Sequence, residues 1–97
     1  MKNTIDTEAV KQLFQAILKL ENEEECYAFF KDICTPNELL AFSQRFDVAI
    51  RLMRGETYQE VSKDTGASTA TISRVKRLLN DDSDGIEMVY QRMDRKK

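Results

Sequence analysis

The chain has 97 residues, a net charge of −2, no histidine and two cysteines, which suffices for one domain but excludes a structural zinc site built from one chain's Cys and His ligands. Histidine is the commonest general base and no serine or cysteine has an activating partner in the sequence, so we expect no catalytic site and no metal. No apolar run approaches the roughly 20 residues of a membrane span and no signal peptide opens the chain, so we expect a cytoplasmic protein with no membrane partner.

Two amphipathic helices are predicted in the first third of the chain. Asp6 or Thr7 can cap the first helix, and Asn22 with Glu25 can open the second as a capping box. Apolar residues recur at three- and four-residue spacing, as on one face of a helix. They are Val10, Leu13, Phe14, Ile17 and Leu18 in the first helix, and Cys26, Phe29, Phe30 and Ile33 in the second.

The run from Thr35 to Glu38 predicts the start of a third helix, with Thr35 as N-cap and Pro36 at the first helical position. This helix is expected to end near Arg54, before a glycine. It is apolar on most sides and therefore central. The first two helices do not offer a wide enough apolar partner, so we predict a homodimer in which residues 1–55 form the dimerisation and core helices.

Residues 57–79 are predicted to form two short helices joined by a tight turn, a helix-turn-helix. Thr57 with Glu60 makes a capping box that starts the first of them. Gly66 can take the left-handed conformation that closes a helix, and Ser68 offers an N-cap for the second. A C-terminal helix is predicted within the remaining stretch, residues 80–97.

The second helix of this motif has two contrasting faces. Ile72, Val75 and Leu79 share one face, which is predicted to pack inward. At about 100° per residue, the other residues fall as follows: Ala70, Ser73 and Arg77 outward, Thr69 and Lys76 on one flank, and Thr71, Arg74 and Leu78 on the other. The outward surface is small, hydroxylated and basic, which suits a helix that enters the major groove of DNA.

The charge distribution agrees with a DNA partner although the net charge does not. Residues 1–34 carry 4 basic and 7 acidic side chains, whereas residues 54–79 carry 5 basic and 3 acidic ones. We predict double-stranded DNA as the partner, and a dimer suits a palindromic operator with half-sites about one helical turn apart. The predicted DNA-binding residues are Gln59, Ser68, Thr69, Ala70, Thr71, Ser73, Lys76 and Arg77.

Arg45 carries a positive charge on an apolar face of the predicted third helix, because its spacing places it on the same side as Phe42 and Ala49. A guanidinium in such a place pairs with an acid, extends along its stem to water, or lines a ligand pocket. Asp47 and Glu38 are the candidate acids. The sequence alone leaves these alternatives open.

Several segments, in this order and nearly this spacing, resemble the Trp repressor family. They are Thr35-Pro36-x-Glu38, Arg45, Leu52-Met53-Arg54-Gly55-Glu56 and Gly66-Ala67-x-x-Ala70-Thr71-Ile72-Ser73-Arg74. The chain is most similar to the short Trp-repressor-like branch found in Gram-positive bacteria. The resemblance implies an all-α, interlaced homodimer with about six helices per chain, so residues 1–97 are expected to form a single Trp-repressor-like domain.

The resemblance also implies a ligand site. In the repressor two arginines enclose the tryptophan ring and a threonine at the start of the central helix helps to bind it, and these positions match Arg45, Arg74 and Thr35. This chain has Val75 where the family has glycine and Leu78 where it has serine, so tryptophan fits poorly. We expect a smaller amino-acid-like corepressor, with histidine suggested by the resemblance alone, and no other cofactor.

These observations predict a sequence-specific DNA-binding transcriptional repressor of amino-acid metabolism genes. One alternative is a ligand-independent DNA-binding protein whose pocket is filled by Val75 and Leu78. Another is a helix-turn-helix scaffold for protein–protein interaction, which the overall acidic balance permits.

Overall fold

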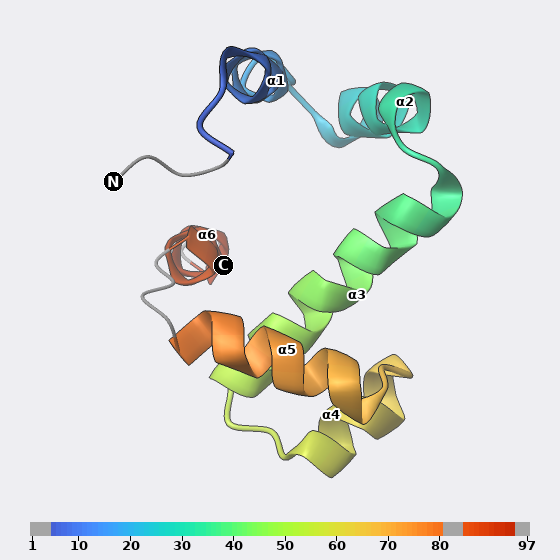
Figure 1. The fold of residues 1–97 in the computed structure, drawn as a ribbon, viewed down its shortest axis with the longest axis vertical. Helices are drawn as coiled ribbons and strands as arrows, with labels where there is room; N and C mark the ends of the chain where they lie inside the picture. The colour runs from blue at the N-terminus through green and yellow to red at the C-terminus, as the bar shows by residue number, and fades with distance from the viewer. Residues whose placement is uncertain (1–4, 81–84, 95–97) are drawn as a thin grey trace. The chain divides into compact units, whose positions relative to one another are not determined.

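A computed structural model of the chain describes residues 5–80 and 85–94, and these residues form six α-helices (Figure 1). They are α1 (Glu8–Ile17), α2 (Glu23–Ile33), α3 (Pro36–Met53), α4 (Tyr58–Thr65), α5 (Thr69–Asn80) and α6 (Gly85–Asp94). The predicted all-α fold with a helix-turn-helix is therefore confirmed. The predicted C-terminal helix corresponds to α6, while residues 81–84 and 95–97 of that range lie outside the described residues. The chain divides into two compact units, Met1–Pro36 and Asn37–Lys97.

The first unit holds α1 and α2, whose N-termini are capped by side chains. Thr7 Oγ1 accepts a hydrogen bond from the Val10 N–H at 3.1 Å, and Asn22 Oδ1 accepts one from the Glu25 N–H at 2.9 Å. The Glu25 carboxylate accepts from the Glu21 N–H rather than from that of Asn22, so the expected capping box is incomplete. Neither α1 nor α2 contains a buried residue in the described chain. Their apolar faces are therefore at most half-buried.

Helix α3 has two contrasting halves. Only its C-terminal half contributes buried side chains, Val48, Ala49 and Leu52. Its N-terminal half exposes large apolar residues, such as Leu40, which is 66% exposed, and Phe42. The prediction of a central helix thus holds within one chain only for the C-terminal half of α3.

The core of the second unit is formed by α3, α4, α5 and the turn that joins the last two (Figure 1). Its buried residues are Val48, Ala49, Leu52, Val61, Ala67, Ile72 and Val75, and the partly buried Leu79 and Ile86 pack against them. Burying the valine, leucine and isoleucine side chains among them stabilises the folded state by about 1.5–3 kcal/mol each. This cluster therefore sets how the helix-turn-helix lies on α3.

The turn of the motif is fixed by its own hydrogen bonds. Thr57 and Glu60 form the complete capping box at the start of α4. Gly66, at the end of α4, has a φ of +76°, the left-handed conformation predicted for it. The Thr65 hydroxyl donates to the Val61 carbonyl at 2.6 Å and accepts from the Ala67 N–H at 3.1 Å. Such bonds hold the N-terminus of α5 at a defined distance from α4.

Arg51 ties the end of α3 to α4. Its guanidinium contacts the carboxylates of Asp47 at 3.1 Å, Glu56 at 3.4 Å and Asp64 at 3.1 Å. The hydrogen bond to Asp47 is the main reason that the pKa of Arg51 is raised above its ordinary value. Because Asp64 belongs to α4, these contacts fix the first helix of the motif against α3.

Helix α6 is linked to the same end of α3. Arg54 Nε donates a hydrogen bond to the Tyr90 hydroxyl at 3.2 Å, and the guanidinium lies 5.8 Å from the centre of the Tyr90 ring. In the part of the chain that the structure describes, no helix is long and apolar enough to cross a bilayer.

Candidate nucleic-acid interface

The orientation of α5 follows from its cap and its buried face. The Thr71 N–H donates to Ser68 Oγ at 3.1 Å, so Ser68 caps the helix as the sequence predicted. Ile72 and Val75 are 1% and 4% exposed, and both belong to the core. The apolar face of α5 is therefore held inward, and the opposite face points to solvent.

The predicted DNA-binding residues differ in how far they are open to solvent. Gln59, Ser68, Thr69, Ala70 and Arg77 are exposed. In contrast, Thr71, Ser73 and Lys76 are half-buried, although Ser73 was expected to point fully outward. Neighbouring side chains partly cover these three. All the predicted residues nevertheless keep some access to solvent.

The structure brings one end of α5 together with the first turn of α4. Gln59 and Thr69 line a shallow hollow of about 330 Å³ with Tyr58, Ser62 and Lys63. Tyr58 and Lys63 were not among the predicted DNA-binding residues. The available signal was spacing, because Lys63 follows Gln59 by four residues and so shares its helix face. Lys63 thus adds a positive charge close to the N-terminus of α5.

The cations of α5 are free to meet an anion. Arg74, Lys76 and Arg77 take part in none of the ion pairs of the described residues. No acidic side chain occurs between Ser68 and Asn80. Helix α5 therefore presents uncompensated positive charge beside its hydroxyl groups, as contact with DNA phosphates would require.

A second cavity, of about 200 Å³, lies on the other flank of α5. It is lined by Arg45, Thr71, Arg74, Val75 and Leu78. The predicted flank of Thr71, Arg74 and Leu78 is therefore one wall of a pocket, and α3 supplies the opposing arginine. Thr71, one of the predicted DNA-binding residues, therefore also lines this pocket.

The structure narrows the alternatives for Arg45. Its guanidinium lies 5.9 Å from the centre of the Phe42 ring, while Asp47 pairs with Arg51. Arg45 forms no ion pair in the described part of the chain. Arg45 is also exposed and lines the pocket, so pairing with an acid is disfavoured, while extension to water and a ligand contact are both compatible with its position.

Thr35, the third predicted ligand contact, is not among the residues that line this pocket. It directly precedes α3, and Arg45 comes ten residues later in the chain. At the helical rise of 1.5 Å per residue, roughly 15 Å separates the two positions along the helix axis. One chain alone therefore does not bring Thr35 to the two arginines.

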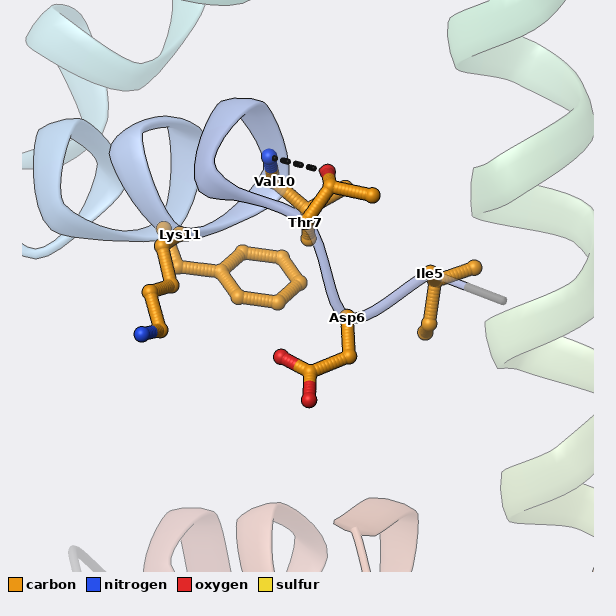
Figure 2. Close-up of a pocket in the computed structure, with 6 residues that line it drawn as sticks. Ile5, Asp6, Thr7, Val10 and Lys11 are labelled. Atoms are coloured by element: carbon orange, nitrogen blue, oxygen red, sulfur yellow. Dashed lines mark hydrogen bonds between the residues drawn. The ribbon is translucent and has the colours of Figure 1, made fainter. Parts of the chain in front are cut away.

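Another hollow, of about 250 Å³, surrounds the N-cap of α1 (Figure 2). Ile5, Asp6, Thr7, Val10, Lys11 and Phe14 line it. Two of its polar side chains are already engaged, since Thr7 caps α1 and Lys11 lies 3.6 Å from Glu8. Most of its lining is exposed. We assign no binding role to this open surface.

Comparisons with known proteins agree on one family. The model described as Trp repressor protein matches residues 8–94. The uncharacterized protein YerC of Bacillus subtilis (strain 168) is 54% identical over 82 residues, which cover 84% of this chain and 79% of YerC. A solved structure of a TrpR like protein from Eubacterium eligens ATCC 27750 is 53% identical, with 95% of each chain covered and a TM-score of 0.90. A solved structure from Staphylococcus aureus is 48% identical, with 96% of each chain covered and a TM-score of 0.90.

Proposed function

The chain belongs to the Trp repressor family, whose members are DNA-binding regulators, and we propose that it is a sequence-specific repressor of amino-acid metabolism genes. The observation that carries this proposal is the face of α5, where unpaired cations and hydroxyl groups point away from a rigid core. As a regulator of genes it acts in the cytoplasm, where bacterial DNA lies.

The first part of the proposal is the contact with DNA. The N-terminal turns of α5 meet base edges in the major groove through Ser68, Thr69, Ala70, Thr71 and Ser73. Gln59, Lys76 and Arg77 then meet phosphates or bases, and Lys63 lies close enough to Gln59 to join them. Small side chains at the start of α5 let the helix approach the bases closely.

The second part is a homodimer on a palindromic operator. Helices α1 and α2 bury no residue of their own within the described chain, and large apolar side chains stay exposed in residues 1–55. These are Ile5, Phe14, Leu18, Tyr27, Ile33, Leu40 and Phe42. Large apolar side chains left exposed in this number favour an interaction with another surface. A second copy of the chain covers it, joins the helices of residues 1–97 into a single domain, and presents two reading helices.

The third part is a corepressor. Arg45 and Arg74 face one pocket beside α5, so a ligand held there touches the reading helix directly. Val75 and Leu78 narrow this pocket, and a smaller amino acid, such as histidine, or a related metabolite fits it better than tryptophan does. Thr35 remains a predicted contact of this ligand.

Selection of bound fragments from genomic DNA tests the proposal. The full chain is mixed with sheared genomic DNA, with and without a pool of amino acids, and the retained fragments are sequenced. We expect one palindromic sequence with half-sites about one helical turn apart. We also expect affinity for that sequence to fall steeply as salt rises. Retention without sequence preference, or binding indifferent to salt, would refute sequence-specific DNA binding through α5.

A further inference from the structure

We propose that Gln59 sets the base specificity of the chain, because its side-chain amide reads one adenine in each half-site of the operator. The inference rests on the proposed function, since the adenine belongs to the DNA bound there. Three properties of Gln59 carry it: the direction of its side chain, its unengaged amide, and the chemistry of the side chains around it.

Gln59 points away from the core of the second unit. Helix α4 is fixed in rotation by Val61, which is fully buried, and by the capping box of Thr57 and Glu60. Gln59 precedes Val61 by two residues, which is about 200° around a helix, and it is exposed. It lines a hollow together with Thr69, the first residue of α5. A helix that enters the major groove by its N-terminal residues therefore brings Gln59 to the same base pairs or to the phosphates beside them.

The amide of Gln59 is free to bind a base. Among residues 5–80 and 85–94, no hydrogen bond engages this side chain, whereas Gln44 donates to the Thr65 carbonyl and Gln91 donates to the Glu87 carboxylate. An amide carries a donor and an acceptor side by side. In Gln59 neither group has to give up a protein partner in order to bind a base.

Adenine is the base that matches an amide. In the major groove adenine presents the N7 acceptor next to the N6 amino donor, so a glutamine can form both hydrogen bonds at once. Guanine presents two acceptors, N7 and O6, which leave the amide oxygen without a donor. Cytosine and thymine each present one hydrogen-bonding group there. Only adenine therefore satisfies both groups of Gln59.

A phosphate contact is the alternative, because the first helix of such a motif crosses the DNA backbone. Lys63 is better suited to that role. It lies one turn after Gln59, lines the same hollow, is exposed, and takes part in none of the ion pairs within the described ranges. An ammonium attracts a phosphate by its full charge, which a neutral amide lacks. Lys63 therefore meets the phosphate and leaves Gln59 to the base.

The amide of Gln59 also differs in kind from the other polar groups of the hollow. The side chains of Tyr58, Ser62, Lys63 and Thr69 end in a hydroxyl or an ammonium group. A single oxygen or nitrogen can bond to several bases, and it discriminates among them less than a bidentate amide does. Adenine specificity at this place therefore depends on Gln59.

Selection from a random duplex library, followed by binding measurements, tests this inference. The wild type, Gln59→Ala and Gln59→Arg are used as full chains, with and without a pool of amino acids, and the condition that gives tighter wild-type binding is kept. We expect the wild type to select one A·T pair in each half-site that Gln59→Ala does not select. Replacing that pair with G·C in both half-sites is expected to weaken wild-type binding at least about 25-fold, from at least about fivefold for each half-site.

The variants assign this preference to residue 59. Gln59→Ala is expected to bind the A·T and G·C operators equally, and Gln59→Arg to prefer the G·C operator, because arginine bonds to the O6 and N7 of guanine. Each readout is a ratio of two affinities of one protein, so a phosphate contact added by the arginine cancels. Gln91→Ala and Gln91→Arg, at an exposed position of α6, are the matched controls and are expected to keep the wild-type ratio.

Three outcomes would overturn the inference while sequence-specific binding stands. They are base preferences that neither variant changes, a wild-type preference for G·C at the affected pair, and an equal loss of affinity of Gln59→Ala for every duplex, which marks a phosphate contact. A wild type that binds every duplex equally would instead refute the proposed function, and the role of Gln59 with it.

Discussion

Replacing Arg77 with alanine is expected to weaken DNA binding strongly in low salt and much less in high salt. Arg77 is exposed on α5 and has no carboxylate partner among the described residues. It lies outside the core cluster, so its loss leaves the packing of α5 intact. The variant therefore removes a phosphate contact from a folded protein.

The size of the effect follows from the release of counterions. Each phosphate contact on B-form DNA contributes about −0.9 to the slope of log affinity against log salt concentration. A homodimer carries Arg77 twice, so the variant is expected to bind with a slope shallower by about 1.8. Over a roughly fourfold rise in salt, from about 50 to 200 mM, the wild type then loses about twelvefold more affinity than the variant.

Fluorescence anisotropy with a labelled duplex of the selected sequence measures both slopes. Arg92→Ala serves as the control, because it removes an exposed arginine of α6 that has no assigned role. Its slope is expected to match that of the wild type. A lower affinity of Arg77→Ala with an unchanged slope would show that Arg77 does not neutralise a phosphate. Unchanged affinity at every salt concentration would show that this face of α5 does not meet DNA.

Stability and assembly are testable at three further positions. Ile72→Ala empties a fully buried site of the core and is expected to lower the free energy of unfolding in urea by about 2–5 kcal/mol. Gly66→Ala places a Cβ at a φ of +76° with no atom within 4 Å of it, so urea unfolding should show only the backbone cost, about 1–2 kcal/mol. Leu40→Glu charges an exposed apolar residue of α3 and should turn the proposed homodimer into a monomer in sedimentation equilibrium, with helix content largely kept. An unchanged dissociation constant of the dimer would show that Leu40 does not lie in the interface.

Helix ends were the part of this fold most open to prediction, because each is set by residues only a few positions apart. Thr57 and Glu60 form the expected reciprocal box, and Gly66 adopts the expected left-handed conformation. The cap of α2 shows the limit of such patterns. Asn22 and Glu25 have the right spacing, yet the Glu25 carboxylate bonds to the N–H of Glu21. The spacing predicts that a carboxylate turns back, but not which N–H it meets.

The side of α5 on which each residue lies was also predictable from the sequence. How far each side chain is buried was not. The spacing alone placed Thr71, Arg74 and Leu78 on one flank, and these residues line one pocket. Periodicity placed Ser73 on the outward face and did not predict that it is half-buried. Ion pairs between residues far apart in the sequence are also not predicted by local spacing. The ion pair of Arg51 with Asp64 joins residues thirteen positions apart.

Both helices of the motif pack into the core, α4 through Val61 and α5 through Ile72 and Val75, but α4 has directional links to α3 in addition. α4 is held by directional links, the ion pair between Arg51 and Asp64 at 3.1 Å and the hydrogen bond from Gln44 Nε2 to the Thr65 carbonyl at 3.3 Å. α5 enters the core through apolar side chains such as Ile72. Apolar contacts are not directional, so they tolerate small rotations that would break a bond of fixed geometry.

A ligand between Arg45 of α3 and Arg74 of α5 would therefore act on the helix whose orientation is less tightly specified. It can change DNA affinity only through the difference between its own affinities for two orientations of α5. A tenfold change needs a difference of about 1.4 kcal/mol. One hydrogen bond between a carboxylate and an arginine contributes about 1.5–3 kcal/mol. A single such bond, made in one orientation of α5 and lost in the other, is enough to couple the pocket to DNA.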